Sequence, residues 1–407
     1  MNRFVLPLLG LWLISTAAAA EAPVAKSDWY YTLGAWVQLV PGGAELRAVA
    51  NGHCPIAHFD AQAGPVTSFV PMAQRAPSNG GFPIMCSLSI PSGVKTVGVD
   101  INEIGEPQAT RTEIFNAPVA DPQRILVLGD TGCRIKGTTV QACNNPIAWP
   151  FAGLAKAAAN LNPDLVIHLG DYLYRESPCP SGNAGCADSP YGDNWETWIA
   201  DFFGPAAPLL HQTPWLFIRG NHEDCSRAGA GFLRLLGPVA FDAASPCTEH
   251  LAPFAVNAGS QTVVVMDNAS ASDTSVDDKS VALYRQDFDA LKGLAGGRED
   301  VWLAAHRPIW AAIKGPLGLP IGGNATMIAA SGDLSAFEAV SLMLSGHIHT
   351  FEAINYTAKV PPQIVAGHGG DNLDPTPADL RGAIFQGQSG VHVKDGLSVG
   401  GFGFLML

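Results

Sequence analysis

Few residues in this sequence are charged, and basic residues are fewer than acidic ones. Charged side chains make up 14% of the 407 residues, with 23 Lys and Arg against 36 Asp and Glu, so the formal net charge is −13. Such a chain lacks the basic stripe that holds a nucleic-acid backbone, and we expect no nucleic-acid partner. Hydrophobic residues reach 47%, enough to bury a sizeable core, and this composition argues against a disordered chain.

Long apolar runs are also missing beyond the N-terminus. No later segment approaches the roughly 18 uninterrupted apolar residues that mark a membrane helix, so we predict no span after the first residues. At the start, Arg3 precedes an apolar run from Phe4 to Ile14, and Ala18–Ala20 offer a small-residue cleavage site. This pattern predicts a signal peptide at residues 1–20 and a periplasmic or secreted protein. The alternative is an uncleaved N-terminal anchor.

The eight cysteines include no C-x-x-C pair, which leaves a zinc ribbon or a thioredoxin-like site without support. In an oxidising compartment an even number of cysteines favours disulfides. Eight cysteines allow more than a hundred pairings, but short loops favour partners that are neighbours in the sequence. The favoured pairs are Cys54–Cys86, Cys133–Cys143, Cys179–Cys186 and Cys225–Cys247.

The chain divides by pattern into two parts after the signal peptide. Short strand-like runs separated by Gly, Pro and Asn predict a small β-rich N-terminal domain at residues 28–118. Residues 123–407 alternate strand and helix patterns, which is typical of a layered α/β domain with helices against its sheets. The chain closes in Gly401–Leu407, an apolar strand without a later partner, and its end is either natural or a truncation.

Five short motifs follow apolar strand patterns in the second part, and each contains Asp, Asn or His, residues that coordinate metals. The carboxyl ends of strands are where open α/β sheets place ligands, and a preceding glycine allows a sharp turn and close approach. Each motif alone is a weak signal, but the ordered set predicts a metal site. His168, inside an apolar strand, is interpreted as a core residue instead. The motifs are Gly129–Gly132, Gly170–Tyr174, Gly220–Glu223, Ala305–Pro308 and Gly346–His349.

In this order the motifs resemble the GD-x-G, GD-x-x-Y, GNH[DE], x-x-x-H and GH-x-H signature of the purple acid phosphatase branch of the calcineurin-like metallophosphoesterases. The resemblance covers about residues 124–370. Gly132 stands where the broader superfamily has His, and Tyr174 also indicates the purple branch. The resemblance implies an α/β fold with a layered β-sandwich core flanked by helices. It also implies a metal-dependent hydrolase of small phosphate esters, monoesters or diesters, in which metal-bound hydroxide attacks phosphorus.

The resemblance further implies two metal ions, with no organic cofactor. Phenolate and carboxylate donors suit Fe(III), whereas imidazoles and an amide oxygen suit a divalent ion such as Zn, Fe or Mn. Asp171 is expected to bridge the two ions and is counted among the catalytic residues. The first ion would be held by Asp130, Asp171, Tyr174 and His349. The second would be held by Asp171, Asn221, His306 and His347.

His222 is the predicted catalytic acid or phosphate contact, because imidazole donates a proton near neutral pH and follows Asn221. The alternative is that His222 orients a ligand. Glu223 or Asp224 would orient His222. His306 is not followed by the further histidines of plant-type purple acid phosphatases, so Arg307 is either a phosphate contact or a surface charge.

Other features near the motifs leave alternatives open. Residues 177–193 are predicted to form a disulfide-pinned loop near the site entrance. Tyr191, Trp195 and Trp198 are candidates for stacking on a leaving group. The alternative for Trp195 and Trp198, which we favour for Trp198, is that they are helix residues facing the core. His368 is a candidate substrate-side residue.

Nucleotidase and phospholipid-headgroup hydrolase fit the same metal chemistry. The alternative from another class is an exported phosphoester-binding module with a non-catalytic metal site. Oligomeric state is left open.

Overall fold

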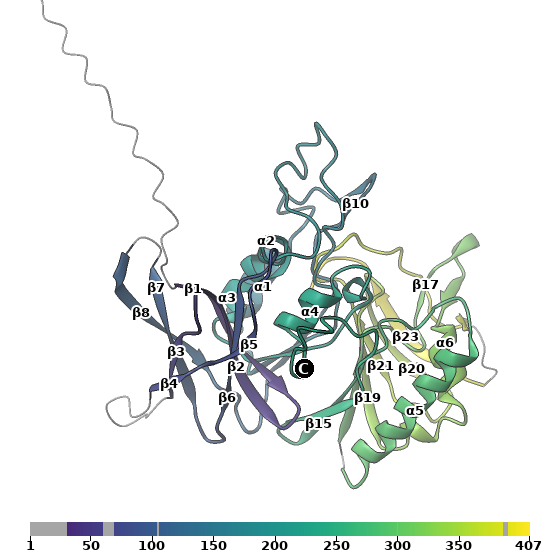
Figure 1. Ribbon diagram of the computed structural model, residues 1–407. Coiled ribbons are helices and arrows are strands. Elements are labelled where there is room, and N and C mark those ends of the chain that lie inside the picture. Colours follow the sequence, from purple (N-terminus) through teal and green to yellow (C-terminus); the bar gives the residue numbers. More distant parts are fainter. Residues whose placement is uncertain (1–30, 60–68, 104–105, 299, 386–389) are drawn as a thin grey trace, which may run out of the picture.

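The computed structural model describes residues 31–59, 69–103, 106–298, 300–385 and 390–407 (Figure 1). The predicted signal peptide at residues 1–20 lies outside these residues. Among the helices of the described ranges, none combines the length and apolar character needed to cross a bilayer.

Two large sheets pack face to face. Between them lies a core of aliphatic side chains, to which Val127 and Ile167 of one sheet and Val263 and Leu344 of the other contribute. The first sheet has the order β24 (Leu405–Met406), β9 (Ile125–Leu128), β12 (Leu165–His168), β13 (Trp215–Phe217), β1 (Tyr31–Val40), β2 (Gly43–Asn51), β6 (Ile84–Ile90) and β5 (Ala73–Ala76). The second has the order β14 (Phe254–Ala258), β15 (Gln261–Met266), β16 (Val301–Ala305), β19 (Val340–Ser345), β21 (Gln363–Ala366), β20 (Phe351–Tyr356) and β23 (Val393–Val399).

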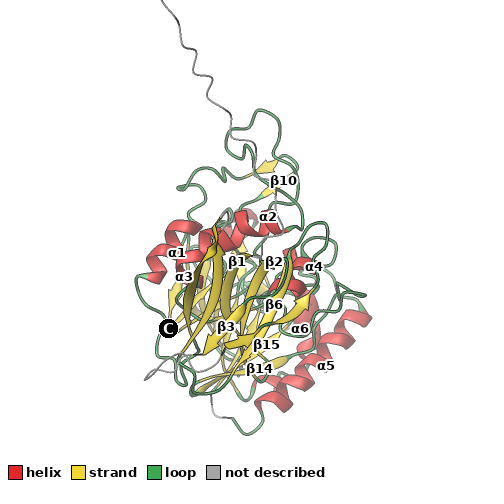
Figure 2. Ribbon diagram, turned by 60° about the vertical axis from the view of Figure 1, so that its left-hand side comes forward, coloured by secondary structure: helices red, strands yellow, loops and turns green. Residues whose placement is uncertain are grey.

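Helices cover the outer face of each sheet, as Figure 2 shows with strands between two groups of helices. On the first sheet lie α1 (Phe151–Ala159), α2 (Trp195–Trp198), the π-helical turn η1 (Ile199–Phe203), α3 (Gly204–Leu210) and α4 (Gly229–Leu235). On the second lie α5 (Asp278–Ala295) and α6 (Ala325–Ser331). Strands β9, β13 and β16 are apolar throughout, and β12 is apolar up to His168, because both faces of each strand are covered. The predicted layered β-sandwich flanked by helices is confirmed.

The N-terminal part is rich in β-structure, as predicted, and half of its strands extend the first sheet. Strand β1 pairs in parallel with β13, with Gln38 opposite Trp215, and antiparallel with β2. The Arg47 guanidinium on β2 donates to the carbonyls of Leu235 and Gly237. A separate sheet has the order β4 (Phe69–Pro71), β3 (Ile56–Phe59), β7 (Thr96–Glu103) and β8 (Glu106–Asn116). The division into domains at residues 118–123 stays a prediction.

The cysteine pairing follows the short-loop expectation. The structure contains Cys54–Cys86, Cys133–Cys143, Cys179–Cys186 and Cys225–Cys247, so all four favoured pairs are confirmed. The C-terminal strand has a partner earlier in the chain: Leu405 lies opposite Val127, at the edge of the first sheet.

Smaller elements lie outside the two sheets. They are β10 (Ile135–Lys136), β11 (Thr139–Val140), β17 (Ala312–Lys314), β18 (Pro320–Gly322), β22 (Ile384–Phe385), and the 3-10 turns η2 (Asn221–Glu223), η3 (Pro316–Gly318) and η4 (Ser335–Phe337). The strands β17, β18 and β22 form one small sheet.

Candidate metal centre

The five motifs meet where strands of the two sheets end. Strands β9, β12 and β13 of the first sheet run in parallel, as do β15, β16 and β19 of the second. Their carboxyl ends therefore open at a common edge of each sheet. Three motif residues, Asp130, Asp171 and His347, have left-handed backbones with φ of 57°, 60° and 68°. A left-handed conformation costs a non-glycine residue roughly 1–3 kcal/mol of folding free energy, and such residues are concentrated at functional sites. These three turns therefore orient their side chains at a cost in stability.

Glycines allow the motifs to approach one another closely. A Cβ added at Gly220 would lie 2.1 Å from Oδ1 of Asp171, and one added at Gly346 would lie 2.5 Å from Oδ2 of Asp130. Either contact is shorter than packing permits. At Gly220 and Gly346 the glycine is therefore required by the neighbouring carboxylate rather than by the turn alone.

One group of predicted ligands surrounds Tyr174. Ligand atoms of Asp130, Asp171 and His349 all lie within 4.8 Å of one another. The buried Tyr174 hydroxyl donates to Oδ2 of Asp171 at 2.9 Å and lies 3.2 Å from Oδ1 of Asp130 and 3.1 Å from Nε2 of His349. The four side chains predicted for the first ion are thus brought together.

A second group shares Asp171 with the first. Ligand atoms of Asp171, His306 and His347 lie within 4.8 Å of one another, and Oδ1 of Asn221 is 2.9 Å from Nε2 of His306. All seven residues predicted as metal ligands therefore lie in one cluster, and the Asp171 carboxylate belongs to both halves of it.

Hydrogen bonds outside the cluster fix which histidine nitrogen faces it. Nδ1 of His306 donates to the Leu169 carbonyl and Nδ1 of His349 to the Asn372 carbonyl, each at 2.7 Å. Both rings thus keep Nε2 for a ligand, an arrangement typical of metal-binding histidines. His347 is turned the other way, because its Nε2 lies 2.9 Å from Oδ2 of Asp273, which leaves Nδ1 for the cluster.

The buried carboxylates attract positive charge. Burial opposes protonation of both histidines, yet Asp171 raises the pKa of His306 to about 9, and Asp130 raises that of His349 to about 10. Burial, reinforced by Asp171 and Asp130, raises the pKa of Tyr174 well above its ordinary value. A metal cation in either group would bring positive charge to these buried carboxylates.

His222 borders the cluster, and its partner differs from the one expected. Its backbone N–H donates to Oδ1 of Asp171 at 2.8 Å, and its ring lies on the Tyr174 ring with centroids 3.9 Å apart. Nδ1 of His222 lies 2.7 Å from Oε1 of Glu176. The expectation that Glu223 or Asp224 orients this ring is wrong: Glu223 accepts four backbone N–H groups, and Asp224 pairs with Arg227.

Glu176 is one of the functional candidates that the motifs did not reveal. Burial opposes its ionisation, but His222 and Lys136 lower its pKa to about 2. Asp273 is another, because it joins His347 to Arg307 through its carboxylate. Glu176 directly follows the Tyr174–Arg175 pair, a position that proximity to a motif could have suggested. Asp273 lies 74 residues before His347, and no local pattern marks it.

The structure also shows the surroundings of His168 and Arg307, two residues that the sequence analysis singled out. His168 is a core residue, as interpreted: it is buried, its Nε2 bonds Oγ1 of Thr131 at 2.9 Å, and burial holds its pKa well below the ordinary value. Arg307 is bound to Asp273, the Ala269 carbonyl and His347, so it is not a free surface charge.

Outside the cluster, Trp195 and Trp198 are 7% and 0% exposed and belong to the core, whereas Tyr191 is 50% exposed. His368 packs against Phe351, and burial lowers its pKa to about 4. Its role toward a substrate stays a prediction.

The sandwich of two sheets, with a cluster of carboxylates and imidazoles at their strand ends, defines the metallophosphoesterase class of fold. The sequence model of the calcineurin-like phosphoesterase family matches residues 123–351, and the chain belongs to this family. No curated protein sequence matches the chain.

Two solved structures are similar in fold. A purple acid phosphatase, PPD1, from yellow lupin (Lupinus luteus) seeds superposes with a TM-score of 0.56 at 12% identity, over 92% of this chain and 69% of that one. PhoD superposes with a TM-score of 0.55 at 13% identity, over 95% of this chain and 93% of that one. At such identities the likeness concerns the fold alone.

Proposed function

We propose that this protein is an exported hydrolase of phosphate esters that works with two metal ions held by the seven clustered side chains. The observation that carries the proposal is the position of Asp171. Its carboxylate lies with Asp130 and His349 on one side and with His306 and His347 on the other. A carboxylate shared between two sets of donors is suited to bridging two cations.

The donor chemistry fits two unlike ions. Around Tyr174 the donors are a phenol, two carboxylates and one imidazole, a set that suits Fe(III). Around His306 they are two imidazoles, an amide oxygen and the shared carboxylate, a set that suits divalent Zn, Fe or Mn. A pair of cations there would lower the pKa of a bound water and offset charge on the phosphoryl oxygens.

His222 is the proposed proton donor to the leaving oxygen. Its Nε2 lies 4.0 Å from Oδ2 of Asp171, at the edge of the cluster, and its Nδ1 lies against the Glu176 carboxylate. The Glu176 carboxylate beside Nδ1 holds the ring in position, so that an Nε2 proton can be donated toward a bound ester. Phosphate contact remains the second role for the same ring.

Export and domain division complete the proposal. Four disulfides favour an oxidising compartment, in agreement with the signal pattern at residues 1–20. The clustered residues all lie in the proposed catalytic domain at 123–407, which follows the proposed N-terminal domain at 28–118.

The test compares hydrolysis of p-nitrophenyl phosphate with that of bis-p-nitrophenyl phosphate. The oxidised protein without its first twenty residues would be supplied with Fe, Zn or Mn. We expect metal-dependent turnover, and the preferred ester separates a phosphatase from a phosphodiesterase. No turnover of either ester, although two ions are bound, would contradict the hydrolase and favour a phosphoester-binding module.

A further inference from the structure

An apolar groove opens beside the proposed metal centre. It encloses about 400 Å³, and His347 forms part of its wall. Asp374 lies in the same wall and accepts the backbone N–H of His349 at 2.9 Å. The groove therefore continues from the Gly346–His349 motif. Its apolar lining consists of Pro308, Ile313, Ile321, Ile348 and Ile384, and we call it the isoleucine groove.

The outer part of this groove exposes aliphatic side chains. Ile384 on β22 is 60% exposed and Ile321 on β18 is 36% exposed, and both belong to the small sheet with β17. Leu317 and Leu319, in the connection between β17 and β18, are 99% and 52% exposed. Exposed apolar side chains gathered at a groove are typical of ligand-binding sites.

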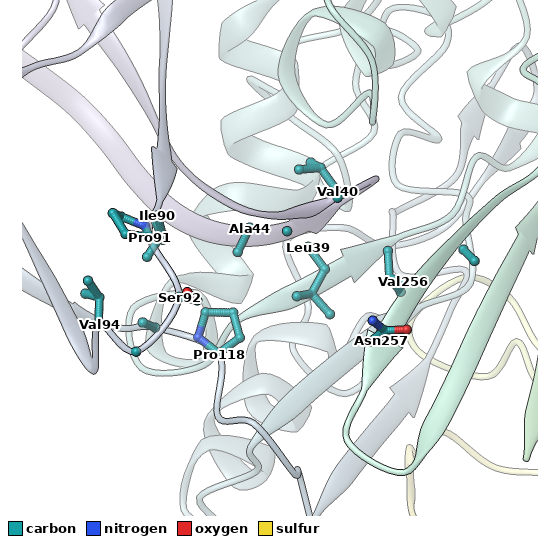
Figure 3. A pocket seen from close by; sticks show the side chains of 15 residues that line it. Leu39, Val40, Ala44, Ile90, Pro91, Ser92, Val94, Pro118, Val256 and Asn257 are labelled. Atoms are coloured by element: carbon teal, nitrogen blue, oxygen red, sulfur yellow. The ribbon is translucent and has the colours of Figure 1, made fainter. Parts of the chain in front are cut away.

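Other cavities lack this combination. A second cavity shares Asp273 and Thr274 with the isoleucine groove, but polar groups line it, among them Asp224, Glu249 and Ser272. The cavity of Figure 3, lined by Leu39 and Val256 among others, contains none of the proposed metal ligands. Of these three cavities, the isoleucine groove alone is both apolar and in contact with a proposed ligand.

We propose that the isoleucine groove binds an unbranched aliphatic substituent of the phosphate ester, a proposal that rests on the function proposed above. The substituent would lie along Ile321 and Ile384 while the phosphate reaches the cluster at His347. Among the described residues the lining includes no Phe, Tyr or Trp, so it offers no large aromatic platform for stacking a flat group. Each methylene moved from water to an apolar site contributes up to about fourfold in binding. Chain length is therefore the variable to test.

The experiment uses a series of p-nitrophenyl phosphodiesters whose second substituent is methyl, butyl or octyl, at concentrations below micelle formation. The leaving group is the same in all three, so only the second substituent changes. We expect kcat/KM to rise at least tenfold from methyl to octyl, and Ile384→Glu to abolish the rise. Ile114→Glu is the matched control, because Ile114 is 59% exposed and lies on β8, outside the groove.

The outcomes separate this inference from the function on which it rests. Turnover that is equal for the three esters both in solution and in vesicles, or a rise that survives Ile384→Glu, would overturn the groove while leaving the hydrolase intact. No turnover of any ester would overturn both. A rise with dissolved octyl ester identifies a free alkyl phosphate as the fitting substrate. A rise that appears only when the ester is carried in dioleoylphosphatidylcholine vesicles, and that Ile384→Glu removes, identifies a membrane lipid.

Discussion

Oε1 of Glu176 lies 2.7 Å from Nδ1 of His222, whose other ring nitrogen, Nε2, lies at the edge of the proposed metal centre. Lys136 and Arg227 also contact this carboxylate, at 3.0 and 3.4 Å, so Glu176 is held in place from three sides. His222 thereby has a fixed anionic partner, as expected of a group that donates protons.

Replacing Glu176 with Gln should impair proton donation by His222. We expect kcat to fall by about tenfold to a hundredfold, the usual effect of removing a supporting partner. The loss should be larger for an alkyl leaving group, which needs a proton, than for p-nitrophenolate, which does not. Measured kcat values for the two leaving groups, with metal content held equal, provide the check. An equal loss for both would indicate a structural role for Glu176.

Tyr174 should be visible spectroscopically if the adjacent ion is Fe(III). Its hydroxyl lies within 3.2 Å of both Asp130 and Asp171, so the phenolate would share an ion with these carboxylates. We expect the iron-loaded protein to show a visible tyrosinate-to-iron charge-transfer band, and Tyr174→Phe to remove the band. Replacing the exposed Tyr191 by Phe is the control, and a band that persists in Tyr174→Phe would contradict the assignment.

The Cys225–Cys247 disulfide closes a loop just after the Gly220–Glu223 motif, over a sequence separation of 22 residues. In the chain-entropy account, the Cys225→Ser/Cys247→Ser variant should lose about 3 kcal/mol of unfolding free energy. The shorter Cys179–Cys186 loop, with a separation of 7, should contribute about 2 kcal/mol. Urea denaturation of the two double variants measures both values. A larger loss for the shorter loop would show that native-state contacts outweigh loop length.

His250 provides a pH-dependent contribution to stability away from the site. The hydrogen bond from Nε2 to Oδ2 of Asp287, at 2.7 Å, raises the pKa of His250, although burial opposes this. A folded-state pKa above the unfolded value means that the added stability is complete below about pH 6.5 and is lost as pH rises through the folded value. The partly exposed pair should contribute no more than about 1 kcal/mol. Thermal unfolding of His250→Gln should thus differ more from the parent at pH 5.5 than at pH 8.5, and the reverse order would refute this sign.

The sequence predicted which side chains lie together at the strand ends because its signals are local. Each ligand follows an apolar strand such as Ile125–Leu128, and a strand end determines where its next residue lies. Helix α5 also begins at a local signal, because the Asp277 side chain accepts the backbone N–H of Ser280 and caps its start. The short-loop cysteine pairs are also local features.

Contacts between residues far apart in the chain could not be predicted from the sequence. The parallel pairing of β1 with β13 joins Gln38 to Trp215 over a sequence separation of 177 residues, and nothing in either segment encodes that choice. Asp273 faces His347 for the same reason, through sheet order rather than spacing. The partner of His222 was misassigned because adjacency favoured Glu223, whose carboxylate is occupied by backbone N–H groups.

The most direct test of the central claim is the number of metal ions bound per chain by the parent protein and by Asp171→Asn. Asp171 is the one carboxylate common to both ligand groups, so its loss should affect both ions. We predict close to two ions per chain in the parent and in the exposed-carboxylate control Asp289→Asn, and less than one, with loss of ester hydrolysis, in Asp171→Asn. Two bound ions and full activity in Asp171→Asn would contradict the proposed metal centre.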